Sequence, residues 1–580
     1  MAVMQKNHSN VHEGDLRSDG GSPTVPRAIL FNPPFYSNRY PNLGLHSVRT
    51  SLVAKGVDCE DVDLSVKYFN YLVGNILVSP GTVLSRATKI RTMELLTAKE
   101  TLGILPTHFF TPLSFPQKED AFNLNDAADV LRFAANAEAN PFHRFYDAAL
   151  ESEAERLSRA GVAGISIISL HQVVPGLTLA AALRAKFPDL KILLGGSWCS
   201  TMRDRLLRNT ELPALVDFII HGEGETAAAA LMEAIGGGRD FADVPNLIYR
   251  DGNRFRSSGL VHKENLKELP GLRYGTTDEY AVHPDGRSKT IVFETRRGCY
   301  WDKCTFCMHR DGIKGLKTEK DVDVLIEELR NGIASGANNV LFSDSAISPR
   351  RFREISQAII DAGLKFEWWC FIRAEKGFDA ALFELAYRAG CREVNVGVES
   401  VNERIGKLMN KGITAQNVSN ILRAARSAGI ETIVDMLVGF PTETLDECRE
   451  NMDFLEANLP NICQIGANVF SLWKGTEIAE DPRKYGIVTH DDPNSLNPEI
   501  PFEVDRTRFP DAMSKNEALF MAGKMSLLNA KGRSEPEMIP DAKALRSFTA
   551  TYDWGKVTPF RHSSSYRFVE FEGGELAIID

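Results

Sequence analysis

Short apolar runs separated by helical stretches recur along the first half of the chain. Several of these runs have the length and apolar content of buried parallel strands: 28–31, 57–64, 162–168, 192–196 and 216–220. The stretches 43–55 and 177–187 between them have the spacing of helices. This alternation predicts an α/β fold class that begins with a doubly wound, Rossmann-like domain over residues 27–255, with a helical insert at 65–150.

A second series of apolar runs starts near residue 291 with a different spacing. The expected strands are 291–295, 339–343, 367–372, 393–398, 432–438 and 465–471. The expected helices are 319–334, 351–362, 378–389, 414–428 and 444–457. Strand–helix units in series predict a partial, TIM-like (β/α)6 barrel over residues 290–500.

The remaining segments have weaker patterns. Residues 1–26 are polar without periodicity and predict a disordered N-terminus. A polar connector that begins at Arg250 supplies a linker at 256–289 between the two domains. Residues 501–580 predict a small C-terminal α+β region, with a helix at 515–529 and a strand pair around residues 572–574.

Composition limits the class of protein. A chain of 580 residues is too long for one core, and a net charge of -10 argues against nucleic acid as the main partner. No apolar run is long enough to cross a membrane, and the N-terminus lacks the order of a signal peptide. The nine cysteines are an odd count, and most are scattered. A reduced, cytoplasmic protein is therefore expected.

Three cysteines stand together directly after the apolar run Ile291–Phe293. They are Cys299, Cys304 and Cys307. Clustered thiolates at the end of a buried strand favour an iron–sulfur cluster over a disulfide framework, and three ligands leave the fourth iron of a [4Fe–4S] cluster open. A zinc site with His309 as the fourth ligand is the alternative.

This motif resembles the cluster-binding loop of the radical SAM superfamily. That family usually has three residues and then two between its cysteines, with an aromatic residue before the third. Phe306 matches the aromatic residue, but the first gap here has four residues, 300–303. The resemblance implies that the open iron binds S-adenosyl-L-methionine (SAM). An electron donor such as flavodoxin or ferredoxin then drives SAM cleavage to methionine and a 5′-deoxyadenosyl radical.

The same resemblance implies SAM-binding residues at the ends of later strands. They are Asp344, Arg373, Glu399, Ser400, Gly439 and Val469. Asp344 matches a position near the methionine moiety, the Glu399–Ser400 segment contacts the carboxylate and the ribose, and Gly439 and Val469 border the adenine. Asp435 and the segment 408–412 also match family positions.

The first domain carries a second resemblance, to the cobalamin-binding domain fused to many radical SAM enzymes. Open α/β sheets bind ligands at the carboxyl ends of their strands. The implied cobalamin-binding residues at those ends are His171, Gly195, Gly196, Ser197, Gly222 and Glu223. The Asp-x-His-x-x-Gly sequence that supplies a cobalt-ligating histidine elsewhere is absent, so the loop 36–44 is expected to provide no such ligand.

Both resemblances together imply a class B radical SAM methyltransferase-like enzyme. It would methylate an unactivated carbon of a natural-product or peptide substrate, with methylcobalamin delivering the methyl group. Segments at 65–150, 411–412 and 576–580 also resemble peptide-maturation C-methyltransferases. A cobalamin-dependent cyclase, rearrangement or oxidation enzyme remains open, as does a non-catalytic cobalamin or redox sensor. No catalytic acid or base is indicated.

Aromatic residues are the candidates for substrate contact, with a place in the core as the alternative. They are Trp368, Trp369, Trp473, Tyr552 and Trp554.

Overall fold

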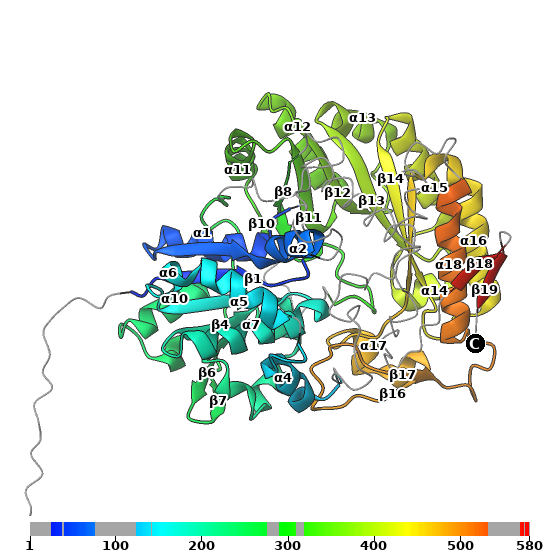
Figure 1. Ribbon diagram of the computed structural model, residues 1–580. Coiled ribbons are helices and arrows are strands. Elements are labelled where there is room, and N and C mark those ends of the chain that lie inside the picture. Colours follow the sequence, from blue (N-terminus) through cyan, green and yellow to red (C-terminus); the bar gives the residue numbers. More distant parts are fainter. Residues whose placement is uncertain are drawn as a thin grey trace, which may run out of the picture.

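Two α/β units lie side by side in a computed structural model of the chain (Figure 1). The structure describes residues 25–36, 40–75, 123, 125–140, 142–274, 289–308, 318–531, 569–572 and 575–578. The predictions for residues 1–24, for most of the insert and for residues 275–288 of the linker lie outside these ranges. In the described part, no helix is both long enough and apolar enough to cross a membrane.

The first unit is built on a seven-stranded sheet in the order β2-β1-β3-β4-β5-β6-β7. Its strands are β1 (Ala28–Asn32), β2 (Cys59–Asp63), β3 (Val162–Ser166), β4 (Lys191–Gly195), β5 (Phe218–Ile220), β6 (Leu247–Asp251) and β7 (Arg254–Ser257). Strands β1 to β5 pair in parallel, as the buried apolar runs predict.

Helices cover both faces of this sheet. They are α1 (Leu43–Ala54), α2 (Leu64–Asn75), α4 (Ala127–Ala135), α5 (Phe142–Ser152), α6 (Ala154–Leu157), α7 (Val173–Lys186), α8 (Ser197–Thr201), α9 (Arg203–Arg208) and α10 (Glu225–Ile235). Residues of α1 and α10 pack on one face, and those of α4, α5 and α7 pack on the other. Each face thus has its own apolar cluster, which confirms the doubly wound fold.

The hairpin β6–β7 corrects one prediction. The segment from Arg250 onward was expected to be a polar connector, but Leu247–Ser257 extends the sheet as two antiparallel strands. Its charged residues sit at the sheet edge, where one face meets water, so its sequence lacks the apolar run of a buried strand.

The second unit has a six-stranded parallel sheet in the order β15-β14-β13-β12-β11-β8. The strands are β8 (Thr290–Phe293), β11 (Asn339–Ile347), β12 (Glu367–Arg373), β13 (Cys391–Glu399), β14 (Glu431–Val438) and β15 (Gln464–Val469). The helices are α11 (Val322–Ala334), α12 (Pro349–Asp361), α13 (Ala380–Arg388), α14 (Glu403–Met409), α15 (Ala415–Ser427) and α16 (Leu445–Asn458). This sheet is the predicted partial barrel.

Side-chain alternation along the barrel strands separates a helical layer from an inner face. On β13, Val394, Val396 and Val398 are fully buried in the main apolar cluster beneath the helices. Asn395 and Glu399 therefore lie on the opposite face, because successive residues of a strand point to opposite sides. Polar side chains at these alternate positions are directed to the inside of the barrel.

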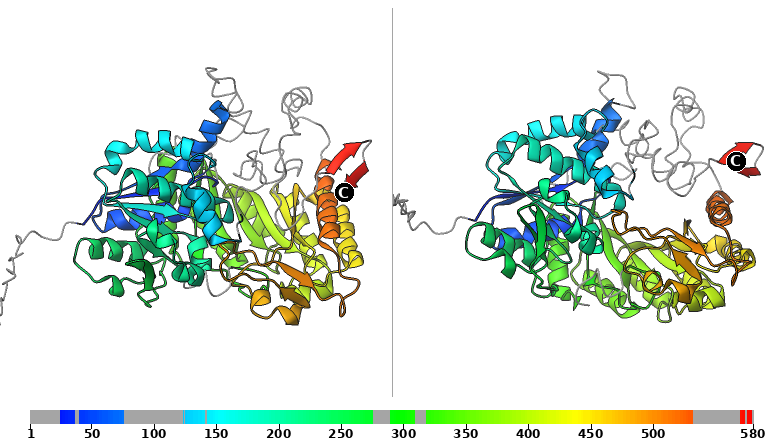
Figure 2. Two further views of the ribbon diagram at one scale, coloured as in Figure 1. Left: turned by 60° about the horizontal axis from the view of Figure 1, so that its bottom comes forward. Right: turned by 90° about the horizontal axis from the view of Figure 1, so that it is seen from below.

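The last part of the described chain closes the barrel and reaches back to the first unit. Helix α18 (Lys515–Lys531) covers the edge strand β15. Its bounds agree with the helix predicted at 515–529. Before it come α17 (Glu477–Glu480) and the pair β16 (Ile487–Thr489) and β17 (Phe502–Val504), which Figure 2 shows in orange. The terminal pair is β18 (Val569–Glu572) and β19 (Glu575–Ile578), the predicted hairpin.

Candidate functional site

The cysteine loop leaves the carboxyl end of β8 and is anchored to the end of α14. The Thr305 amide donates to the Met409 carbonyl at 3.0 Å, and its hydroxyl donates to the Leu408 carbonyl at 2.9 Å. A turn between the second and third cysteines is closed by the Cys307 amide, which donates to the Cys304 carbonyl at 3.2 Å. All three cysteines are half-buried, and none of them forms a disulfide.

The four-residue gap between the first two cysteines has its own support. Asp302 adopts a left-handed backbone (φ 54°), which allows the extra residue to turn. The Trp301 ring lies 3.6 Å from the Arg373 guanidinium, and its indole N–H donates to the Asn410 carbonyl at 2.9 Å. Tyr300 donates to Glu375 at 2.8 Å. The longer gap is therefore held by residues that follow β12 and α14.

The three thiols lie close enough to influence one another. Burial raises the pKa of Cys304 to about 11, nearby Lys411 opposes that effect, and Cys307 and Cys299 add to it. Across the described ranges no group of three His, Cys, Asp or Glu side chains is placed to hold a single metal ion. A [4Fe–4S] cluster does not need such a group, because each thiolate binds a different iron. His309, the alternative zinc ligand, lies outside the described residues.

A buried ion pair lies beside the cysteines at the ends of β13 and α14. The Lys411 ammonium is 3.0 Å from the Glu399 carboxylate, and both side chains are largely buried. Because loss of either partner would leave an uncompensated buried charge, the two charges depend on each other. Arg373 donates to the Lys411 carbonyl at 3.1 Å and pairs with Glu375 at 2.6 Å. Predicted residues Arg373 and Glu399 thus meet at one end of the barrel, next to the cysteine loop.

Other predicted SAM residues already have partners within the protein. Both carboxylate oxygens of Asp344 accept hydrogen bonds from Thr295, at 3.0 and 2.9 Å, and burial raises its pKa to about 6. The Ser400 hydroxyl is 3.2 Å from the Asn451 side-chain oxygen. Val469 packs toward the helical layer. These residues brace the strand ends, and a role toward SAM stays a prediction.

The segment 439–443 forms a closed turn after β14. One oxygen of Glu443 accepts from the Gly439 and Phe440 amides at 2.7 and 3.2 Å, and the other accepts from Asn451 at 3.3 Å. Gly439 has φ 76°, and a Cβ there would lie 2.6 Å from the Ala518 Cβ. The glycine is thus required by the close approach of α18.

Asp435 faces the inside of the barrel at the middle of β14. Burial raises its pKa to about 7, and Glu399 adds to the shift. Gly466, the residue paired with Asp435 on β15, leaves space for this carboxylate. A Cβ at Gly466 would lie only 2.7 Å from it. The barrel interior therefore holds an acidic group near the cysteine end.

The predicted cobalamin residues stand at the carboxyl edge of the first sheet. Ser197 is exposed, and a Cβ added at Gly195 would meet no atom within 4 Å, so this edge is open beside β4. Gly196 has φ 99° and a Cβ there would be 2.3 Å from the Ile167 carbonyl oxygen, so its glycine serves the turn. His171 lies in a short 3-10 helix, Leu170–Gln172, at the same edge. These open, glycine-lined ends fit a large planar ligand.

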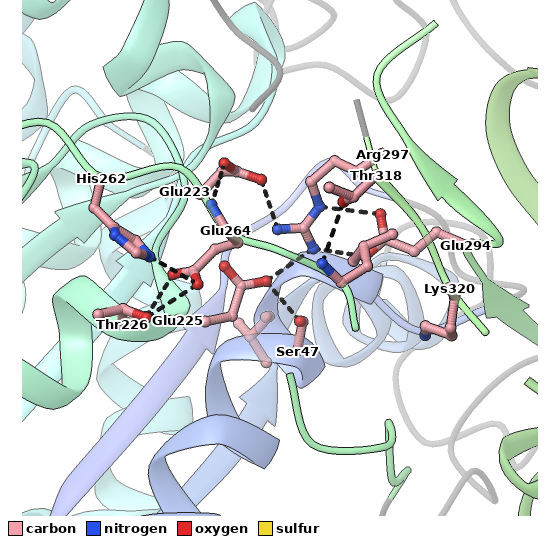
Figure 3. A network of polar contacts seen from close by, with 12 residues as sticks. Ser47, Glu223, Glu225, Thr226, His262, Glu264, Glu294, Arg297, Thr318 and Lys320 are labelled. Carbon is pink, nitrogen blue, oxygen red and sulfur yellow. Dashed lines mark hydrogen bonds and ion pairs between the residues drawn. The ribbon is translucent and has the colours of Figure 1, made fainter. Parts of the chain in front are cut away.

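The loop after β5 forms ion pairs with the second unit that the sequence did not predict. Its Glu223 and Glu225 carboxylates bind the Arg297 guanidinium at 2.8 and 2.9 Å (Figure 3). Arg297 immediately precedes Gly298 and Cys299, so the ligand edge of the first unit meets the start of the cysteine loop. In the sequence, this contact is indicated only by two arginines after a strand and by the Gly-Glu-Gly-Glu segment. Neither pattern shows which residue the other one binds.

Comparison with a family model identifies the second unit. Residues 293–455 match the model of the radical SAM superfamily. Among curated proteins, the chain is 26% identical over 269 residues to an uncharacterized methyltransferase of Pyrococcus horikoshii, a match covering 45% of this chain and 57% of that protein. It is also 26% identical over 357 residues to the hopanoid C-3 methylase of Methylococcus capsulatus, covering 58% and 64% of the two chains.

A third relative has a different named activity. The anaerobic magnesium-protoporphyrin IX monomethyl ester cyclase of Synechocystis is 25% identical over 299 residues, covering 50% of this chain and 56% of that one. The chain thus spans less than two thirds of the length of each of these three relatives.

Two solved structures share the fold over most of the chain. One is the radical SAM methyltransferase TsrM from Kitasatospora setae with cobalamin and a [4Fe–4S] cluster bound, with a TM-score of 0.56, 16% identity and 90% of each chain covered. The other is the cobalamin-dependent SAM radical enzyme OxsB with aqua-cobalamin bound, with a TM-score of 0.60, 15% identity, and 91% of this chain and 71% of that one covered. The order of a Rossmann-like unit followed by a TIM-like unit is therefore confirmed.

Proposed function

Because residues 293–455 form a radical SAM domain, we propose that the chain is a cobalamin-dependent radical SAM enzyme that methylates an unactivated carbon. One observation carries the proposal. The Arg297 contacts join the carboxyl edge of the first sheet to the start of the cysteine loop, so the two ligand-binding edges adjoin. A radical generated at one edge and a methyl donor held at the other would then serve one substrate.

The cluster would be held by Cys299, Cys304 and Cys307, with Lys411 nearby to offset the negative charge of the thiolates. Bound there, it supplies the electron that cleaves SAM. Hydrogen bonds from Thr305 and Trp301 would hold the cysteine loop in place, and Lys411 would supply the compensating positive charge beside it.

Cobalamin would lie at the open edge formed by Gly195, Ser197, Gly222 and neighbouring residues. The named ligands of TsrM and OxsB and the shared fold support this placement. The first loop supplies no Asp-x-His-x-x-Gly sequence, so the cobalt would have no histidine ligand from it.

The substrate is proposed to be a small molecule or a peptide, with the electrons coming from a flavodoxin or a ferredoxin in the cytoplasm. The names of the relatives that methylate support the reaction class but not the substrate. The rings of Trp369 and Phe371 lie on the inner face of β12 with their centroids 5.7 Å apart and their planes tilted by 57°, and they are candidates for substrate contact. Trp368 is buried among core side chains instead. Tyr552 and Trp554 lie outside the described residues.

Anaerobic reconstitution with iron, sulfide, cobalamin and SAM tests the proposal. Mass spectrometry should find both 5′-deoxyadenosine and S-adenosylhomocysteine among the products. Cys304→Ala should lose most of its iron and its SAM cleavage, while Cys463→Ala, a half-buried cysteine outside the loop, should keep both. Product without S-adenosylhomocysteine would rule out methyl transfer.

A cobalamin-dependent cyclase, rearrangement or oxidation enzyme is the second candidate. The likeness to the anaerobic cyclase of Synechocystis favours it, because the same cofactor edges would serve reactions without a methyl group. A product mass increased by one methyl group would decide for methylation.

A further inference from the structure

Arg297 is the only cation that bridges the two units at the cysteine loop among the residues the structure describes. Its guanidinium is 2.8 Å from Glu223, 2.9 Å from Glu225 and 2.5 Å from Glu294, and its side chain is 13% exposed (Figure 3). Glu223 and Glu225 belong to the first unit, whereas Glu294 follows β8 of the barrel. One side chain is therefore clamped from both units.

The two carboxylates of the first unit are also held by hydrogen bonds to groups other than Arg297. The second oxygen of Glu223 accepts the Glu264 amide at 2.8 Å, and Glu225 accepts the Ser47 hydroxyl of α1 at 2.7 Å. Glu264 in turn accepts from the Thr226 amide at 2.7 Å. Because α1 and the segment at Glu264 both hold these acids, they offer Arg297 a rigid binding site rather than flexible surface charges.

The carboxylates around Arg297 need its positive charge to offset their own negative charges. Burial raises the pKa of Glu225, but Arg297 together with the hydrogen bonds from the Ser47 hydroxyl and the backbone outweighs burial, and the net shift is downward. For Glu223 burial exceeds the effect of Arg297, and its pKa is raised. Removal of the guanidinium would leave the buried carboxylates of Glu223 and Glu225 and the partly buried carboxylate of Glu294 facing one another, a much larger penalty than the loss of a surface ion pair.

We propose that Arg297 is a positioning residue that fixes the start of the cysteine loop against the first unit and so sets the separation of the two ligand-binding edges. The next residue, Gly298, has φ 80°, and Cys299 follows it. A shift of the guanidinium would therefore move the first cysteine through a single intervening residue. The effect on the spacing of the cofactors rests on the proposed function. The ion pairs of Arg297 with both units do not depend on it.

Arg205 offers a matched control, because it is a second buried arginine between the units. It is on α9 of the first unit and donates to the Ser495 and Asn497 carbonyls at 2.7 and 3.2 Å. Trp198 reaches the same segment, donating to the Leu496 carbonyl at 3.1 Å. Arg205→Met thus loosens the interface far along the chain from the cysteine loop.

The test compares Arg297→Met, Arg297→Lys and Arg205→Met in the full, reconstituted chain. Hydrogen exchange should rise on the order of tenfold in 223–226 and 298–307 for Arg297→Met, and only near 198–208 and 495–497 for Arg205→Met. The electron paramagnetic resonance spectrum of the reduced cluster with SAM should change for Arg297→Met and stay unchanged for Arg205→Met. Lysine keeps the charge but not the forked donors, so Arg297→Lys should fall between the parent and Arg297→Met.

Unchanged exchange in both loops together with an unchanged spectrum would overturn the proposal. Should Arg297→Met fail to fold by circular dichroism, Arg297→Lys and Glu223→Gln carry the same comparison. Absence of bound cobalamin in the parent protein would contradict the proposed function and would leave the exchange result standing, so the two failures can be told apart.

Discussion

At the scale of single residues, the cysteine loop is held by contacts rather than by its own sequence. Trp301 lies between Arg373 and the Asn410 carbonyl, and the left-handed Asp302 lets the loop take one residue more than the usual family spacing. The unusual gap is thus accommodated by the side chain that ends β12 and by a backbone carbonyl just after α14.

Gly412→Ala should disturb this anchor. Gly412 has φ 65°, and an added Cβ would lie 2.8 Å from the Trp301 ring and 3.0 Å from the Arg373 guanidinium. The strain and the clash should cost about 1–3 kcal/mol and displace the ring, so reconstituted protein should bind less iron per chain. Gly406→Ala is the control, because a Cβ at Gly406 meets nothing within 4 Å. Equal iron content in the two variants would contradict the role of Trp301.

At the scale of elements, helix α18 seals the exposed edge of the barrel sheet. Its Asn529 side chain accepts the Ile465 amide at 2.7 Å and donates to the Ile465 carbonyl at 3.0 Å. This side chain takes the place of a seventh strand at one point of β15, and the edge is thereby protected from pairing with another chain.

Asn529→Ala should destabilise the fold by about 2 kcal/mol or more, because it leaves a buried amide and a buried carbonyl without partners. Denaturant unfolding monitored by circular dichroism would measure the loss. Asn516→Ala, on the exposed side of the same helix, should change the free energy of unfolding by no more than about 0.5 kcal/mol. Similar losses for both variants would show that the Ile465 contact is unimportant.

The elements that the sequence predicted are those whose signal is local. Alternation of apolar runs predicted the strands of both sheets, because that pattern is contained in short segments. Three neighbouring cysteines predict the metal site for the same reason, and that site stays a prediction. The hairpin β6–β7 was missed because its edge position tolerates charge, and α14 because its span Glu403–Met409 is too short for periodicity. The partners of Arg297 were out of reach, because Glu223 lies 74 residues away and only the packing of two units brings them together.

At the scale of the whole molecule, buried acids make stability depend on pH. Burial raises the pKa of Asp435, Glu443 and Glu393 to about 7 each. The folded state therefore keeps protons that the unfolded chain has already released near pH 4 to 5. The stability that these three groups contribute falls as pH rises toward and through 7, because at these groups the folded state binds more protons than the unfolded state.

Asp435→Asn isolates one of these contributions in the protein without cofactors. The variant cannot ionise, so its melting temperature relative to the parent should be higher at pH 8.5 than at pH 6, where the parent carboxyl is still largely protonated. Thermal unfolding at the two pH values measures the difference, and Asp511→Asn, an exposed acid, sets the baseline. The same difference for Asp435→Asn and Asp511→Asn would mean that Asp435 is ionised at pH 6. Asp435 would then have to be stabilised as a carboxylate by Lys411, and the barrel interior would present a fixed negative charge to its ligand.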